Sequence, residues 1–334
     1  MDRATTLHER RRLALRDICL ESAEDVAEYN LGLHVTALFV LFIVSGMAAV
    51  FPVLATRYTF LRIPPTFFFV VRHFGTGVLI ATAFCHLLPT AFSNFNDPCM
   101  GEFWTETYAA MPGAISLGSV FIVMTIEMLV SPFRRTSTLE LMPAVEAALQ
   151  DSEGCCSPAS CGKIQETDVS INEKDLKPKR IQVVLLEAGI IFHSIFVGLT
   201  LGVTTGSAFV SLFVAIIFHQ SFEGPALGSR IALAGWSPRT WRPWMMALAY
   251  GCTQLVGIGT HKLYSPDSQV GHTVVGFFNA VSSGFLLYAA LVELLSEDFL
   301  SQRSWYEMRG GRRVVAFALV FVGAFLMALI AHWV

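Results

Sequence analysis

Residues 181–228 read IQVVLLEAGIIFHSIFVGLTLGVTTGSAFVSLFVAIIFHQSFEGPALG and decide the fold. Two mostly apolar runs, 181–203 and 207–228, lie within this stretch, and only residues 204–206 separate them. A helix needs roughly 20 apolar residues to cross about 30 Å of hydrocarbon. Each run therefore predicts a membrane-spanning helix, and the short connection predicts a tight antiparallel hairpin.

Apolar runs of this length recur along the whole chain. Its 334 residues are 54% hydrophobic and 15% charged, whereas a soluble domain carries about 25% charged residues. The net charge of -3 gives no indication of a nucleic-acid partner. We therefore predict an all-α integral membrane protein with eight transmembrane helices in a lipid bilayer. The predicted spans are 33–56, 68–92, 113–132, 181–203, 207–228, 243–260, 272–296 and 313–333.

The long polar stretch 134–180 has no apolar periodicity and is typical of a flexible loop. Lys and Arg fall almost entirely on the set of alternating connections that includes this loop, and the other set holds only Lys262 once the N-terminal tail is set aside. Such residues mark the cytosolic side, so both termini are expected outside the cytosol. The predicted parts are an extracytosolic tail (1–31), transmembrane helices 1–3 (32–133), a flexible cytosolic loop (134–180), and helices 4–8 (181–334) with a metal site on helices 4 and 5.

Ionisable residues at membrane depth are functional candidates by default, because burying them in lipid is unfavourable. The sharpest signal is the pair His219 and Glu223, which are four residues apart and share one helix face with Cβ atoms roughly 5–6 Å apart. Zinc accepts both imidazole and carboxylate ligands. The alternative for the isolated pair is a His–Glu hydrogen bond that holds two helices together.

His193 lies in the other helix of the hairpin at about the same depth as His219. Gly198 and Gly202 form a small-xxx-small pair that allows close helix approach. Alone, His193 is equally well explained as a packed, hydrogen-bonded histidine. Two histidines and Glu223 at one depth favour a metal site.

The remaining polar residues are ordered by depth. His86 is expected near the external end, and Glu187, Glu127 and Glu293 toward the cytosolic end. Several moderate sites in a row are typical of an ion path. Glu127 and Glu293 are equally well explained as interfacial residues that reach water. The external connection 93–112 is acidic and would concentrate cations, with carboxylates at Asp97, Glu102 and Glu106.

These residues give the chain a family resemblance. It resembles the ZIP (Zrt/Irt-like) metal transporters, in particular their fungal and plant branch. The motifs that carry the resemblance are FCHLLP (84–89), His193-Ser194 with Gly198, HQSFEG (219–224), and SGFLLY (283–288) before Glu293. The resemblance implies an eight-helix bundle with external termini, in which helices 1, 4, 5 and 6 carry zinc or iron(II) toward the cytosol past a scaffold of the other helices.

The chain also departs from the family pattern. Some members hold two metals, and here Val197, Gln220 and Gln254 stand where those members have carboxylates. We therefore predict one principal site at His193, His219 and Glu223, with Ser194 and Gln220 as weak oxygen donors.

Our interpretation is a divalent-metal transporter, not an enzyme, that takes up Zn²⁺ as substrate and has no prosthetic group. The alternatives are Fe²⁺, Mn²⁺ or Cd²⁺ as the ion, a membrane zinc hydrolase, in which the site would activate water, and a small-ligand receptor, which leaves the His–Glu cluster unexplained. A plasma-membrane location is expected, with a vacuolar membrane and a homodimer as open alternatives. Cys155, Cys156 and Cys161 in the loop 134–180 form a metal-sensing patch or are incidental.

Overall fold

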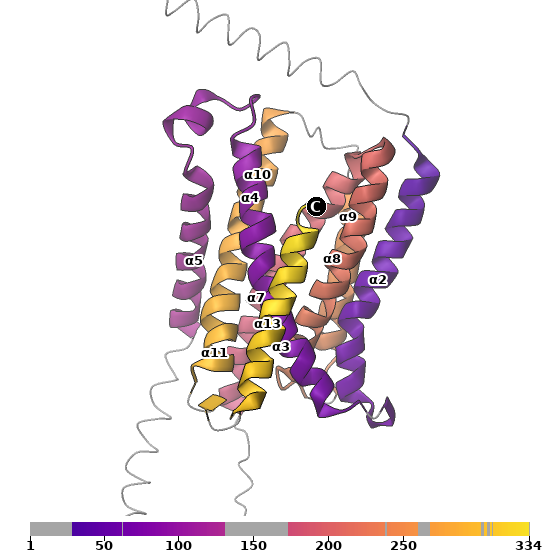
Figure 1. The fold of residues 1–334 in the computed structure, drawn as a ribbon, viewed down its shortest axis with the longest axis vertical. Coiled ribbons are helices and arrows are strands. Elements are labelled where there is room, and N and C mark those ends of the chain that lie inside the picture. The colour runs from indigo at the N-terminus through magenta and orange to yellow at the C-terminus, as the bar shows by residue number, and fades with distance from the viewer. Residues whose placement is uncertain are drawn as a thin grey trace, which may run out of the picture.

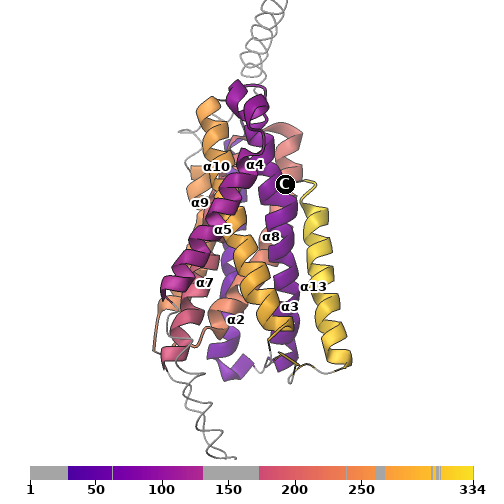
Figure 2. The ribbon, with the colours of Figure 1, turned by 90° about the vertical axis from the view of Figure 1, so that its left-hand side faces the viewer.

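The computed structural model describes residues 29–61, 63–130, 173–237, 239–259, 268–301, 304–305, 308 and 310–333. Within these residues the chain forms eight long helical segments that stand side by side, and no strand (Figure 1, Figure 2). In chain order they are α2 (Leu31–Arg57), α3–η2–α4 (Pro65–Ala81, Thr82–Leu87, Leu88–Phe95), α5 (Met111–Val130), α7 (Glu173–Val203), α8 (Gly206–Leu233), α9 (Arg242–Gly259), α10–η5–α11 (Gln269–Leu287, Tyr288–Leu295, Ser296–Phe299) and α13 (Gly311–Ile330). The short helices η1 (Thr59–Leu61) and η3 (Phe103–Thr107) lie in connections.

Seven segments in the described part of the chain are long and apolar enough to cross a membrane, and α9 is the long helix outside this group. α9 is less apolar because it carries polar residues such as Thr253 and Gln254 on a face buried against α2 and α7. The long helices coincide with the eight predicted spans. The predicted all-α membrane bundle is therefore confirmed.

The outermost helices present apolar side chains to their surroundings. In the spans of α5 and α13 only 22% of the residues are buried within the protein. Phe317, Phe321 and Phe325 recur every four residues along α13 and are all exposed. Their spacing places them on one side of the helix, which suits contact with lipid acyl chains.

The two ends of the bundle differ in their residues. At the hairpin end, at the top of Figure 1, α7 turns into α8 through Thr204 and Thr205, α4 ends and α10 begins. Gly206 opens α8 with a φ of 67°, a left-handed conformation that glycine adopts without steric strain. The predicted tight hairpin is therefore present. The opposite, basic end carries Arg57, Arg72, Arg230, Arg242 and Arg312.

The start of α7 corrects one predicted boundary. The polar composition predicts residues 173–180 as part of the flexible loop, but α7 begins at Glu173. Hydropathy detects only the apolar part of a helix, and these first turns are polar. The rest of the loop up to residue 172, including Cys155, Cys156 and Cys161, lies outside the described residues, as does the tail 1–28.

Glycines bring several helix pairs into close contact. A Cβ added to Gly77 of α3 would lie 1.9 Å from the carbonyl oxygen of Val320 in α13. Gly198 of α7 lies against Gln254 of α9, so a Cβ there would be 2.8 Å from the Gln254 Oε1 atom. Gly198 therefore allows close packing of α7 against α9, and not against its hairpin partner α8. Five helix positions separate Gly198 from His193, which turns the two toward different neighbours.

The apolar core lies on both sides of the middle of the bundle. One buried cluster comes from α2, α7, α8 and α9 toward the hairpin end and includes Leu41, Leu201 and Phe209. A larger cluster extends toward the basic end and includes Leu186, Leu227 and Tyr250. The polar residues described next lie between these two clusters.

Candidate metal site

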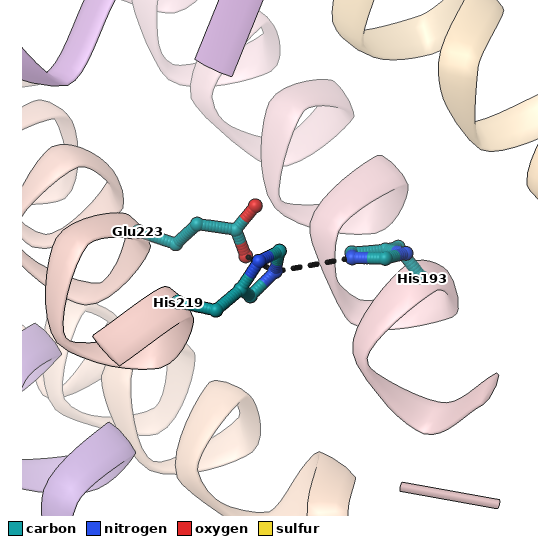
Figure 3. Close-up of side chains that lie close together, drawn as sticks. All are labelled: His193, His219 and Glu223. Carbon is teal, nitrogen blue, oxygen red and sulfur yellow. Dashed lines mark hydrogen bonds and ion pairs between the residues drawn. The ribbon is translucent and has the colours of Figure 1, made fainter. Parts of the chain in front are cut away.

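His193, His219 and Glu223 converge in the middle of the bundle (Figure 3). α8 places His219 and Glu223 one turn apart on the same face, and α7 presents His193 from across the hairpin. The Nε2 atoms of the two histidines are 3.2 Å apart, and His219 Nε2 is 3.3 Å from Glu223 Oε2. All three residues are completely buried.

This geometry fits the coordination of one metal ion. Zinc binds nitrogen and oxygen ligands at about 2.0–2.2 Å, so ligand atoms in a tetrahedral site are roughly 3.3–3.5 Å apart. The two short distances in the cluster match that separation, and all three ligand atoms lie within 4.8 Å of one another. His219 Nε2 thus lies beside two atoms at once, His193 Nε2 and Glu223 Oε2. A neutral imidazole carries one proton on one nitrogen, so His219 Nε2 can donate to at most one of these two atoms, whereas a cation would satisfy all three.

His86 borders the same cluster. Its ring centroid is 5.0 Å from that of His193 and 5.3 Å from that of His219, and the side chain is buried. The sequence-based placement near the external end is therefore wrong. The predicted span ends at residue 92, but the helix continues to Phe95, which leaves His86 more deeply buried. His86 contacts both candidate ligands without joining the convergent ligand atoms.

Comparison with known proteins identifies the fold. The family described as "ZIP Zinc transporter" matches residues 31–331. The chain belongs to the ZIP family. "Zinc-regulated transporter 2" of Saccharomyces cerevisiae is 29% identical to this ZIP chain, over 96% of the chain and 99% of the relative. "Zinc-regulated transporter 1" of Schizosaccharomyces pombe is 30% identical over 94% and 88%, and "Zinc transporter 5" of Oryza sativa is 32% identical over 91% and 87%. The resemblance inferred from the motifs is confirmed.

The carboxylate of this ZIP site is oriented by a threonine that the sequence pattern does not single out. Thr82 begins the π-helical segment η2, and its hydroxyl donates a hydrogen bond of 2.8 Å to Glu223 Oε1. Glu223 Oε2 is thereby turned toward the histidines. Groups that hold a metal ligand in place contribute to metal affinity. The one feature of the sequence that could have indicated this role is the position of Thr82, one turn before His86 on the same helix.

Replacing Thr82 by valine tests this orienting role. The substitution keeps the side-chain shape and removes the hydroxyl, so we expect the KM for zinc uptake to rise about 10–100-fold. Thr125→Val is the matched control, because Thr125 is exposed on α5 and its hydroxyl donates to the carbonyl of Phe121 in its own helix. Initial uptake rates against free zinc measure both variants. An unchanged KM in Thr82→Val would show that Glu223 needs no such support.

Ser194 and Gln220, predicted as weak oxygen donors, lie beside the cluster and contact each other. Gln220 Nε2 donates to Ser194 Oγ at 3.5 Å, and Ser45 Oγ donates to Gln220 Oε1 at 3.3 Å. All three residues are fully buried. In this conformation their polar atoms are engaged within a small network that joins α2, α7 and α8. Their part in metal binding stays a prediction.

Two further positions bear on the sequence-based prediction that a second metal site is missing. Val197 lies in the apolar cluster on the hairpin side. Gln254 is fully buried, and among the described residues neither amide atom of its side chain has a hydrogen-bond partner. Neutral residues at these positions supply no charge for a second dication. The single principal site stays a prediction.

The remaining predicted residues lie toward the basic end. Glu187 and Glu293 are buried, and Glu293 lines a cavity at this end together with Gln182, Arg72 and Arg230. Glu127 accepts hydrogen bonds from the Tyr288 hydroxyl and, at 3.2 Å, from Gln182 Nε2. Glu127 thus joins α5, η5 and α7. This contact gives Glu127 a structural role, and its part in an ion path stays a prediction.

Proposed function

We propose that this chain carries zinc across a membrane by binding it at His193, His219 and Glu223. The observation that carries the proposal is a fully buried group of two imidazoles and one carboxylate in the middle of a ZIP-family membrane bundle. The curated relatives bear the names of zinc transporters. A buried carboxylate at membrane depth needs a cation to compensate its charge.

The chemistry of the site suits an ion that binds and leaves again. Two nitrogens and one carboxylate oxygen supply three of the four ligands that zinc usually takes. A water molecule, Ser194 or Gln220 can complete the set. The two free cysteines in the described residues, Cys85 and Cys252, are not among the converging ligands. A site without thiolate does not hold zinc as a structural Cys-rich site does.

The direction of transport follows from the charge of the two ends. The basic end carries the arginines and is proposed to face the cytosol. An apolar cluster lies between the site and the hairpin end, whereas cavities open at the basic end. Glu187 and Glu293 lie on that side of the site and would receive the ion. We therefore propose uptake toward the cytosol. The proposed location is the plasma membrane, with a vacuolar membrane as the alternative.

The main competing ions are Fe²⁺, Mn²⁺ and Cd²⁺, which accept the same ligand types. A hydrolase would need a separate acid or base positioned beside the metal, and no observation favours one. We expect the purified protein in liposomes to accumulate Zn²⁺ on an internal fluorescent chelator, with excess Fe²⁺, Mn²⁺ and Cd²⁺ added in turn as competitors. Absence of zinc accumulation above protein-free liposomes would refute the proposed function.

A further inference from the structure

A second pair of metal-binding side chains lies at the hairpin end, away from the central site. Asp97 follows α4, and His272 lies in the first turn of α10. His272 Nε2 is 3.6 Å from Asp97 Oδ1, and His272 Nδ1 is 3.2 Å from Asn94 Oδ1. The side chains of His272 and Asp97 are 17% and 29% exposed, so an ion can reach them.

The hydrogen bonds around this pair fix which atoms face each other. Asn94 Nδ2 donates to the carbonyl of Thr90 at 2.8 Å, which assigns the oxygen of the amide to the His272 side. Because that oxygen only accepts, His272 Nδ1 must be the donor. In the neutral ring, Nε2 then carries a lone pair that points at the Asp97 carboxylate. Two acceptors that face each other need a cation or a proton between them.

The pair is also held in position. The backbone N–H of Cys99 donates to Asp97 Oδ1 at 2.8 Å. Gly276 of α10 packs closely against the end of α4, since a Cβ added to Gly276 would lie 2.9 Å from the ring of Phe95. Each candidate ligand thus has a supporting contact, as ligands of metal sites usually do. His272 Nε2 and Asp97 Oδ1 are 3.6 Å apart, slightly more than the roughly 3.3 Å expected for two ligands of one zinc ion. A small movement of either side chain would bring them to that separation.

The pair lies on the two helices that lead to the central site. Asn94 in α4 is eight residues from His86 in η2, about 12 Å of helix rise. His272 is seven residues from Asn279 along α10, about 10 Å, and the Asn279 side chain interacts with His193. We propose that Asp97 and His272 form a capture site where the transported divalent cation binds before it enters the bundle. The proposal rests on the proposed function, which supplies the ion and the direction.

Two protein ligands and several waters make a weak and rapidly exchanging site, which suits capture from solution. The neighbouring η3 carries Glu106, and Glu102 precedes it. Carboxylates near a mouth raise the local concentration of cations. We therefore expect the capture site to affect the KM for the metal ion and to leave the maximal rate of uptake unchanged.

Asp97→Asn separates a metal site from a structural contact. The new amide can donate a hydrogen bond to His272 Nε2 only by giving up the one that Asp97 Oδ1 accepts from Cys99 N–H, so a purely structural pair would show a change in heat stability and none in KM. A metal site loses its charged ligand, and we expect the KM for zinc uptake to rise about 10-fold with the maximal rate retained. His272→Gln should act in the same way, while His272→Cys, which offers a thiolate, should restore a low KM. His332→Ala, a histidine beyond the end of α13, is the control and should match the wild type.

A binding measurement completes the test without transport. In a His219→Ala/Glu223→Ala background, equilibrium dialysis with radioactive zinc should show residual binding that Asp97→Asn removes. Unchanged KM and unchanged binding in Asp97→Asn would overturn the capture site, as would a fall in maximal rate and heat stability without a change in KM. Loss of all uptake by the wild-type protein, with Asp97-dependent binding intact, would instead count against the proposed function.

Discussion

Replacing Glu223 by alanine is expected to lower zinc uptake more than about 100-fold, beyond the range for losing a mere supporting contact. Glu223 is the single carboxylate of the converging group, and it is fully buried. Without it, a dication in the middle of the bundle would have no opposite charge, which is strongly unfavourable in a low-dielectric interior. Initial rates of zinc accumulation in liposomes measure the loss.

Glu223→Gln sharpens this test, because the amide keeps the volume and can still accept the hydrogen bond from Thr82. We expect it to be nearly as inactive as Glu223→Ala, since charge is what it lacks. His219→Ala should be comparably inactive, and the double variant should be no worse than either single one. Substantial uptake by Glu223→Ala and His219→Ala would contradict the assignment of the site.

Asp298→Ala is expected to destabilise the protein by about 3–5 kcal/mol. Asp298 in α11 is almost completely buried and forms ion pairs with Arg72 of α3 and, at 3.2 Å, with Arg230 of α8. Thr76 also contacts both Asp298 and Arg230. Removing the carboxylate leaves two arginines without their shared partner. Heat denaturation in detergent, followed by the loss of the monodisperse peak on gel filtration, measures the effect.

The adjacent residue supplies the control for this prediction. Glu297 pairs with Lys179 at 3.6 Å, but both side chains are more than 40% exposed. An exposed pair of this kind contributes about 1 kcal/mol or less, so Glu297→Ala should remain close to the wild type. Equal stability of the Asp298 and Glu297 variants would mean that the buried network does not hold α3, α8 and α11 together.

The amino-acid sequence is most informative where helix geometry alone fixes the outcome. Residues four apart on one helix share a face, and a very short connection forces antiparallel neighbours. These two rules are enough to bring His219, Glu223 and His193 together on the basis of their spacing. The span count follows equally directly from the lengths of the apolar runs.

The parts that could not be predicted depend on helix rotation and on helix ends. Hydropathy ends a span where polar residues begin, which hides the last turn of α4 and the first turns of α7 and misplaces His86. Thr82 carries no charge, and its role depends on α3 and η2 facing α8. The pairing of Asp298 with Arg230 joins residues that are far apart in sequence, and only the packed bundle brings them together.

The π-helical turn of η2 separates the two halves of one membrane helix. A π turn holds one more residue than an α turn, and each residue of a helix adds about 100° of rotation. The extra residue therefore fixes how far the half that carries Asn94 is rotated about the helix axis relative to the half that carries Gly77. Loss of one residue within Thr82–Leu87 would leave Gly77 packed against α13 and turn Asn94 away from α10. The number of residues in that one turn thus decides whether α3 can pack against α13 while α4 packs against α10.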